Sequence, residues 1–229
     1  MNRTRQYTVY FALALGALVF SVVLQYLPGA YFNKYFGDAN PYLVFIVVPA
    51  VGAAVLWWLQ SSFGFEVFKG WATLQGIGLS AIFATALGIA IVIADLVIRY
   101  PQDTNVPVPQ ALLFYPAIGF IAEIIFHLAP LAVLLLVMKP LVGRLGKDRV
   151  VWIGILLVAS SEPTFQLIFV FKAFTWGDAY TWIHIFTISL LQLYVFKRFD
   201  FVSMLVFRMI YYLYWHILWG VARLDLLFS

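Results

Sequence analysis

The stretch Leu74–Val97, LQGIGLSAIFATALGIAIVIADLV, decides the class of fold to which this chain belongs. It is a continuous apolar run with a single charged residue, Asp95, near its end. A helix needs roughly 20 mostly apolar residues to cross a lipid bilayer, so this run is long enough for one crossing. Apolar and polar residues do not alternate along it, which disfavours a strand of a membrane barrel. We therefore expect a transmembrane helix here.

Six further stretches have the same character, and together they predict an all-α polytopic bundle of about seven spans. The fourth is long for one crossing, which predicts a tilt, a kink at Pro116 or Pro130, or a partly interfacial end. The first follows Arg3 and Arg5, but it is too long for the apolar region of a signal peptide. The expected spans are Tyr7–Leu27, Tyr42–Leu59, Leu74–Val97, Ala111–Met138, Val150–Phe171, Tyr180–Phe196 and Phe201–Gly220.

The composition of the chain agrees with a membrane protein and excludes several other classes. Of the 229 residues, 64% are hydrophobic and only 10% are charged, which is too few charges to cover a soluble domain. The same figures exclude disorder. The chain has no cysteine, which excludes disulfides, thiolate nucleophiles, iron–sulfur clusters and cysteine-ligated zinc. The formal charge of +4 comes from loop residues, so we expect membrane lipids around the chain and no nucleic-acid partner.

The distribution of basic residues predicts the orientation, because Lys and Arg accumulate in cytoplasmic loops. With the N-terminus in the cytoplasm, nine loop cations lie inside and four outside, and seven spans place the C-terminus on the opposite side. The inner group is Arg3, Arg5, Lys69, Lys139, Arg144, Lys147, Arg149, Lys197 and Arg198. The outer group is Lys34, Arg99, Lys172 and Arg223.

Two of the connections between spans carry a specific expectation. Gln60–Trp71 contains Glu66 and Lys69 and is too short to cross, so a helix there is expected only as an interfacial one. Ile98–Gln110 is rich in proline and predicts an ordered, extended loop. There is no convincing internal repeat, which weighs against a transporter built from duplicated halves. We divide the chain into N-terminal spans with their connecting loop, 1–110, and a C-terminal group of helices, 111–229.

Ionisable residues inside spans are costly, so each is a candidate for a functional role. Glu123 and His127 are four residues apart on one helix and share a face. The same spacing aligns residues of the last span, and Gly220 leaves room beside them for close approach. A structural ion pair is the alternative for Asp95 and for Glu162 with Arg208. The residues of the last span that share a face in this way are Arg208, Tyr212 and His216.

The same carboxylate and histidine side chains are also of the types that bind metals and cofactors. Glu and His at this spacing, with a second carboxylate and a second histidine elsewhere, form a workable ligand set for zinc, iron or manganese. The His-Glu-x-x-His signature of a zinc peptidase is absent from the sequence, and we expect no metal. A single axial histidine could hold a haem or a chlorin, but nothing selects such a cofactor, and its identity stays unknown.

Four short motifs in the C-terminal half occur in an order and spacing that resemble the CPBP family of intramembrane peptidases. The first runs from Ala122 to Leu128, AEIIFHL, and is followed by the basic turn 143–149. Ser160-Ser161 then precedes FQLIF at 165–169. Finally, a second basic turn at 197–200 leads into a helix that carries HILWG at 216–220. That family includes CAAX prenyl endopeptidases and bacteriocin-processing relatives, and the resemblance implies a CPBP-like core in the last four helices.

The resemblance also implies a mechanism, and this chain departs from it at four positions. In the family, a leading glutamate and a second-motif histidine activate water, and a final histidine and asparagine stabilise the oxyanion. The family's Glu, Arg, His and Asn are replaced here by Ala122, His127, Phe169 and Gly220. The residues that remain are Glu123, Phe126, Phe165 and His216.

We therefore expect a divergent, proteolytically inactive member of that family. It would bind another integral membrane protein, a lipid-modified peptide or a cofactor through the former active-site cavity. One alternative is a working intramembrane endopeptidase with a rebuilt site. Another is an accessory subunit of a larger energy-converting or pigment-bearing membrane complex. The candidate catalytic residues for the rebuilt site are Glu123, His127, Glu162 and His216.

Overall fold

The fold comes from a computed structural model that describes residues 2–29, 31–169 and 175–229. Within these ranges the chain is helical and contains no strand. Seven helical segments there are long and apolar enough to cross a membrane, which confirms the all-α polytopic bundle. These segments are Arg3–Gln25, Pro41–Phe63, Trp71–Ile98, Ala111–Leu145, Lys147–Ile168, Trp176–Arg198 and Phe201–Leu227. Phe171, the expected end of the fifth span, and Lys172 lie outside the described residues.

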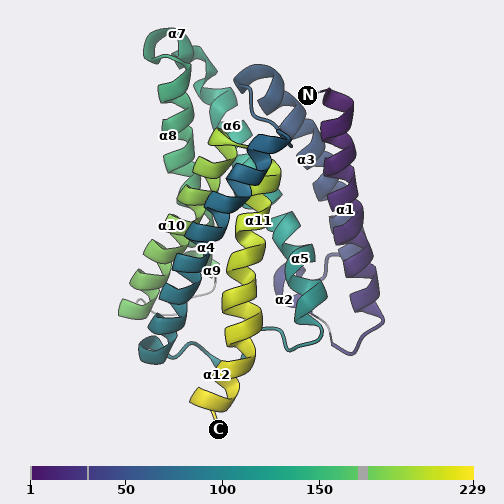
Figure 1. The fold of residues 1–229 in the computed structure, drawn as a ribbon, viewed down its shortest axis with the longest axis vertical. Coiled ribbons are helices and arrows are strands. Elements are labelled where there is room, and N and C mark those ends of the chain that lie inside the picture. Colours follow the sequence, from purple (N-terminus) through teal and green to yellow (C-terminus); the bar gives the residue numbers. More distant parts are fainter. Residues whose placement is uncertain (1, 30, 170–174) are drawn as a thin grey trace.

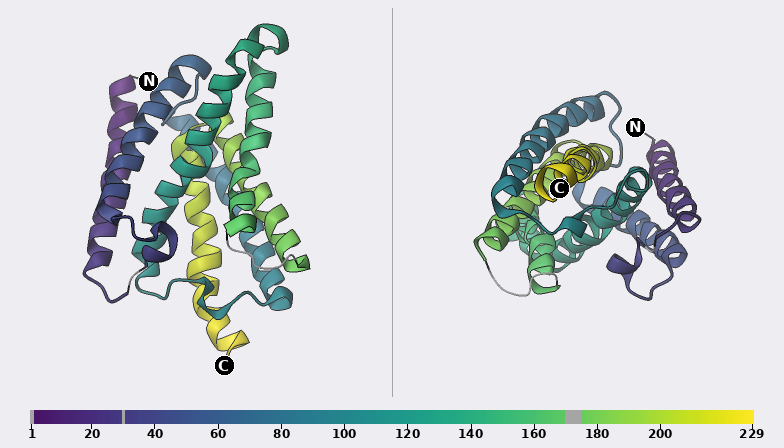
Figure 2. Two further views of the ribbon diagram at one scale, coloured as in Figure 1. Left: turned by 180° about the vertical axis from the view of Figure 1, so that it is seen from behind. Right: turned by 90° about the horizontal axis from the view of Figure 1, so that it is seen from below.

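The spans run along the long axis of the molecule, so the two termini lie at opposite ends (Figure 1). The last span packs against α4 and against α5 (Figure 2). Helices α1 and α3 pack against each other and against α5. The bounds are α1 Arg3–Gln25, α3 Pro41–Phe63, α4 Trp71–Ile98, α5 Ala111–Ala122, α11 Phe201–Tyr212 and α12 Trp219–Leu227, with the segment η4 Leu213–Leu218 between the last two.

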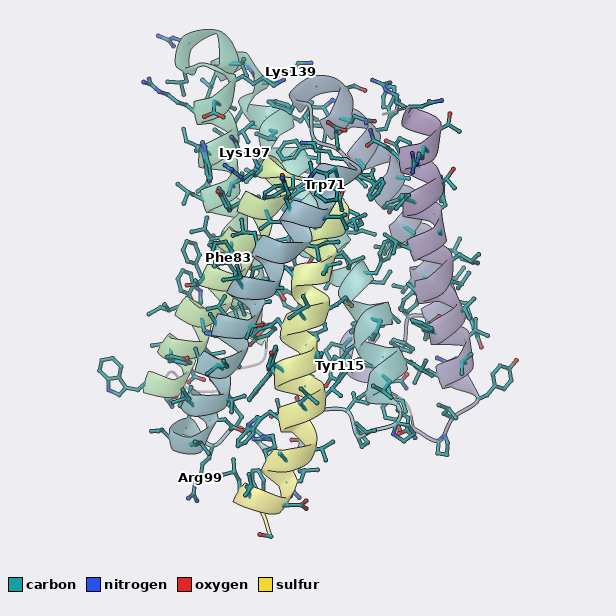
Figure 3. All side chains as sticks on the ribbon, viewed as in Figure 1. Trp71, Phe83, Arg99, Tyr115, Lys139 and Lys197 are labelled. Carbon is teal, nitrogen blue, oxygen red and sulfur yellow. The ribbon has the colours of Figure 1, made fainter. Side chains whose placement is uncertain are left out.

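The remaining helices complete the bundle and its connections. They are α2 Asn33–Phe36, α6 Ala129–Met138, α7 Val142–Leu145, α8 Lys147–Ala159, α9 Ser161–Phe169 and α10 Trp176–Arg198, with the short segments η1 Gln102–Thr104, η2 Glu123–Leu128 and η3 Lys139–Leu141. Lys139 and Lys197 lie near one end of the spans and Arg99 lies near the other (Figure 3).

The connection between α3 and α4 contains no helix, so the interfacial helix considered for Gln60–Trp71 is wrong. Gly64, with a φ of +79°, ends α3 in a left-handed conformation. The following backbone pairs with the start of α11 instead: Phe201 donates its N–H to the Glu66 carbonyl at 3.0 Å, and Val202 donates to the Val67 carbonyl at 3.1 Å. Those pairings use backbone groups that a helix would need for its own hydrogen bonds.

Asp200 fixes the same junction from the other side. It is fully buried and caps α11, because its Oδ1 accepts the Ser203 N–H and Oγ–H, each at 2.8 Å. Its Oδ2 accepts the Lys69 N–H at 2.9 Å and the Thr73 hydroxyl. A carboxylate that accepts this many donors has no further capacity for chemistry, so Asp200 is a structural residue.

A π-helical segment, η2, interrupts the fourth span at the position where the sequence predicts a kink. Pro130 has no N–H and cannot bond the carbonyl of Phe126, four residues earlier. The Ser161 hydroxyl donates to that carbonyl at 3.0 Å, and Ala129 donates to Ile124, five residues back. Ser161 on the next span therefore compensates for the proline, and the wider turn carries Glu123 and His127.

The fifth span is broken at Ser160, between α8 and α9. Pro163 removes the N–H that would bond the carbonyl of Ala159, which explains why the helix cannot continue regularly. After the break, Glu162 lies in the first turn of α9 with its side chain turned into the bundle, only 8% exposed. Proline thus shapes both of the segments that supply the carboxylates of the site described below.

The last span is longer than expected, since α12 continues to Leu227 rather than ending at Gly220. Arg223, expected among the loop cations, is therefore inside a helix and fully buried. That assignment is wrong for a specific reason: Arg223 forms an ion pair with Asp95, 2.7 Å from Nε to Oδ2. Because the two charges are paired, α12 can continue past Arg223 without burying an unpaired charge.

Candidate buried ion-pair cluster

Glu123 lies at the centre of the bundle and is fully buried. Its Oε1 accepts from Arg208 Nε at 2.6 Å and from the Gln192 side-chain amide, and its Oε2 accepts from His127 Nδ1 at 2.5 Å. These donors come from three different segments, α11, α10 and η2. A carboxylate offers about four acceptor positions, so this one is close to saturated.

Arg208 joins Glu123 to the second carboxylate of the site. Its Nη1 and Nη2 donate to the two oxygens of Glu162 at 3.1 and 2.9 Å, a bidentate pairing, while Nη1 also donates to the Tyr212 hydroxyl at 3.1 Å. The guanidinium is 3% exposed. The pairing of Glu162 with Arg208, one of the two readings left open by the sequence, is the arrangement in the structure. Arg208 is the residue that holds the two acidic segments together.

His127 is the member of the cluster with unused hydrogen-bonding capacity. Because the Glu123 carboxylate can only accept, Nδ1 carries the proton that it shares with Glu123. The other ring nitrogen, Nε2, is buried and has no hydrogen-bond partner within the described residues. Its nearest acidic neighbour is Glu162, with Oε2 at 3.9 Å. We call Glu123, His127, Glu162, Gln192 and Arg208 the central cluster.

His216, the fourth candidate residue, has partners of its own. It lies in the second π-helical segment, η4, and its Nδ1 donates to Asn105 Oδ1 at 2.6 Å. Its ring stacks on Tyr115 at 4.2 Å and meets the Tyr212 ring edge-on at 4.9 Å. Among the described residues no hydrogen bond or ion pair joins it to the central cluster, and only Tyr212 touches both. Tyr115 lies on α5 beside the last span (Figure 3).

Asn105 also occupies the space that Gly220 leaves open. A Cβ at position 220 would lie 3.1 Å from Asn105 Nδ2, so the glycine is what admits the loop amide. That amide nitrogen is buried and has no hydrogen-bond partner in the described part of the chain. Asn105 lines a cavity of about 240 Å³ as well, together with Tyr31, Tyr35 and the loop residues 103–107. We call this cavity the distal recess.

Asp95 and Arg223 form a second buried ion pair at the same end of the bundle. Both side chains are fully buried. Asp95 also accepts from Trp219 Nε1 at 2.7 Å and from the Tyr100 N–H at 2.8 Å. Arg223 donates to the carbonyls of Tyr100 and Pro101 at 2.6 and 2.9 Å. This pair ties the 98–110 loop to α12, which agrees with the ordered loop that its prolines predict.

Tyr100 adds a further link from this loop to α10. Its hydroxyl lies 2.6 Å from Thr181 Oγ1, and burial raises the pKa of Tyr100. The phenol is therefore neutral at physiological pH and serves as a hydrogen-bonding group. It is part of the structural attachment of the loop and lies apart from the central cluster.

The chemistry open to the central cluster is narrow. It contains two carboxylates and one guanidinium, so its carboxylates outnumber its guanidinium by one. Ala122, the residue before Glu123, is 8% exposed and adds no polar group. The side chain of Phe169 lies outside the described part of the structure. Among the described residues no group of three His, Asp or Glu side chains is placed to hold a metal ion.

Two residues of the site were not found from the sequence. Gln192 is an amide in the middle of α10 and is fully buried, yet no motif marks it. Asn105 is a loop residue whose contact with His216 spans 111 positions of the chain. The one signal available was Gly220, whose missing side chain leaves space for another group beside the helix.

No family model, curated protein or solved structure matches the chain.

Proposed function

We propose that this chain is a non-proteolytic, multi-pass membrane protein of the CPBP type that works by binding a segment of another integral membrane protein. The observation that carries the proposal is the state of Glu123. Its carboxylate is fully buried and engaged by Arg208, His127 and Gln192. The family resemblance rests on the four motifs, and the loss of activity rests on this geometry.

Peptide hydrolysis needs a base that can reach a water molecule. The Glu123 side chain has no exposed surface, and its carboxylate is in direct contact with the Arg208 guanidinium. Loss of a general base removes about 10²–10⁴ in rate. His216 lies apart from Glu123, because its Nδ1 is held by Asn105 and its ring packs against two tyrosines, so the two residues do not form an acid–base pair. Both features favour a binding protein over an enzyme.

The distal recess supports a polypeptide ligand. It offers hydroxyl and amide groups together with the rings of Tyr31 and Tyr35, in a volume of about 240 Å³. The recess lies at the ends of the spans, where an extramembrane segment of a neighbouring membrane protein can reach it.

Catalysis is tested by comparing the wild type with Glu123→Gln. Each would be co-expressed with candidate membrane proteins, and new N-termini would be mapped by mass spectrometry. We expect identical patterns, because Glu123 is a structural residue in this proposal. A cleavage product that is present with the wild type and absent with Glu123→Gln, at equal protein level, would establish the rebuilt peptidase instead.

Binding is tested with a photo-crosslinking amino acid placed at Tyr35, which lines the recess. Tyr26 is the matched control, since it is a tyrosine at the same end of the bundle, 83% exposed and outside the recess. We expect a discrete crosslinked membrane protein from position 35 and none from position 26. Equal crosslinking from both positions would contradict a recess-specific partner. If positions 35 and 26 both crosslink to one and the same protein, the result would favour an accessory subunit embedded in a larger complex.

We also propose that the N-terminus is cytoplasmic and the C-terminus lies on the opposite side. The proposal rests on the concentration of basic residues at the end that holds the N-terminus, as Lys139 and Lys197 illustrate (Figure 3). A reporter that is active only in the cytoplasm should be silent when fused after Ser229 and active when fused before Asn2. The reverse result would invert the orientation.

A further inference from the structure

A second cavity lies at the basic end of the bundle, and none of the residues that line it belongs to the central cluster. It has a volume of about 230 Å³ and is lined by the junction of α3 with its following loop, the start of α8 and the end of α10. The lining residues are Phe63, Gly64, Phe65, Lys147, Asp148, Val151 and Lys197. The volume is several times the roughly 30 Å³ that one water molecule takes up in the liquid.

The lining separates into an apolar floor and a basic rim. Phe65 and Val151 are each 4% exposed and form the floor. The ammonium group of Lys147 lies 5.6 Å from the centre of the Phe63 ring, and Lys147 is exposed. Lys197 reaches the rim from α10, where its ammonium group lies 2.7 Å from Asp148 Oδ1. One of the two lysines is therefore paired, and the other is left with only an aromatic ring as neighbour among its described contacts.

The position of the cavity identifies the ligand that it suits. It is formed where three membrane spans end, which is the depth of the lipid headgroups. A lipid phosphate at this depth meets the ammonium groups while its glycerol and acyl ester face the phenylalanines. The surrounding end of the bundle carries further cations, which raise the local concentration of anionic lipid. We propose that this cavity binds the phosphodiester headgroup of an anionic phospholipid, with Lys147 as the principal contact. This inference is independent of the proposed function, because the cavity shares no residue with the central cluster or the distal recess.

The test measures lipid retained by the full-length protein. The purified protein would be titrated with phosphatidylglycerol or phosphatidylcholine, and bound lipid would be counted by native mass spectrometry. The key variant is Lys147→Glu, and the matched control is Arg149→Glu. Arg149 is an exposed residue of the same helix, two positions on and therefore about 200° around it, and it does not line the cavity. Both variants change the net charge equally.

We expect phosphatidylglycerol to be preferred by the wild type and its affinity to fall about fivefold or more in Lys147→Glu, as the loss of one basic contact implies. Arg149→Glu should stay within about twofold of the wild type by the same scale. Lys147→Gln repeats the comparison if the charge reversal lowers the thermal stability. Equal losses of affinity in Lys147→Glu and Arg149→Glu would show that only the overall charge of this end matters, and would overturn the proposed site. Displacement of the lipid by an equal concentration of free glycerol phosphate would assign the cavity to a soluble phosphate instead.

Discussion

The central cluster and the Asp95–Arg223 pair are both buried ion pairs, but they differ in balance. The Asp95–Arg223 pair matches one carboxylate with one guanidinium, and tryptophan, backbone N–H and carbonyl groups complete the set. The central cluster sets two carboxylates against one guanidinium, and among the described residues His127 Nε2 has no hydrogen-bond partner. The first is complete as a structural attachment. Both carboxylates of the second pair with the same guanidinium, that of Arg208, so the largest consequences are expected from the loss of that cation.

The largest effect is expected from removing that single cation. Arg208→Met leaves both Glu123 and Glu162 without a counter-charge, so we expect a loss of at least about 4 kcal/mol in the free energy of unfolding. Arg223→Met leaves one carboxylate that retains Trp219 and a backbone donor, and its loss should be smaller, about 3 kcal/mol. Denaturant unfolding in mixed micelles measures both.

A rescue variant controls for the change in side-chain shape. Combining Arg208→Met with Glu123→Gln and Glu162→Gln removes all the charges together, and most of the lost stability should return. An Arg208→Met protein as stable as Arg223→Met would show that the second carboxylate is not held by Arg208.

The second comparison applies the same chemical change to each region. Asp95→Asn leaves Arg223 charged and buried, so we expect a loss of about 3 kcal/mol in the free energy of unfolding. Glu162→Gln leaves the Glu123–Arg208 pair balanced and retains an oxygen that can accept from Arg208, so its loss should be about 1 kcal/mol or less. Thermal unfolding monitored by circular dichroism would rank the two. The opposite ranking would mean that the central cluster needs both of its carboxylates.

A third prediction concerns how α4 delivers Asp95 to its partner. A Cβ at Gly88 would lie 2.7 Å from the Cβ of Tyr214, so the helix can approach η4 only because residue 88 is glycine. Gly88→Ala should therefore cost about 1–3 kcal/mol in stability through overpacking. Gly78→Ala on the same helix meets nothing within 4 Å and should be neutral or stabilise by up to about 1 kcal/mol. Equal melting temperatures for the two variants would contradict the close approach.

The smallest effect is expected at the hydroxyl that supports η2. Ser161→Ala removes the donor to the Phe126 carbonyl, which Pro130 has already deprived of its helical partner, at an expected cost of about 1–2 kcal/mol. Ser160→Ala is the matched control, because that hydroxyl bonds Leu157 within its own turn. We expect a change below about 0.5 kcal/mol for it. A larger cost at Ser160 would mean that η2 is not held by the neighbouring span.

The sequence predicted the spans well because bilayer thickness sets their length, and length can be counted. It also placed Glu123 and His127 on one face and offered Glu162 with Arg208 as a pair, since helical spacing and charge suffice for both. The partnership of Asp95 with Arg223 was missed because the end of an apolar run does not fix the end of a helix. A buried counter-ion lets the helix continue past the charge.

The local backbone of the site was harder to predict. Pro130 predicts an interruption of the fourth span, but not that Ser161 would take over the freed carbonyl or that the interruption would become a π-helical segment. The break before Pro163 in the fifth span was not predicted. Gln192 and Asn105 are ordinary amides whose role depends on contacts across 69 and 111 positions of the chain. The resemblance to the CPBP family was carried by motif order alone and stays a prediction.

The claim on which the whole account rests is that the surroundings of Glu123 are closed to water, and a cysteine substitution tests it most directly. The chain contains no cysteine, so a single introduced thiol is the only reactive one. Ala122→Cys places it next to Glu123, and Thr104→Cys places a reference thiol in the distal recess. In proteoliposomes treated with a small water-soluble maleimide, we predict modification of Thr104→Cys within minutes and of Ala122→Cys only after unfolding in detergent. Modification of both thiols at similar rates in the folded protein would show a water-filled site and contradict the account.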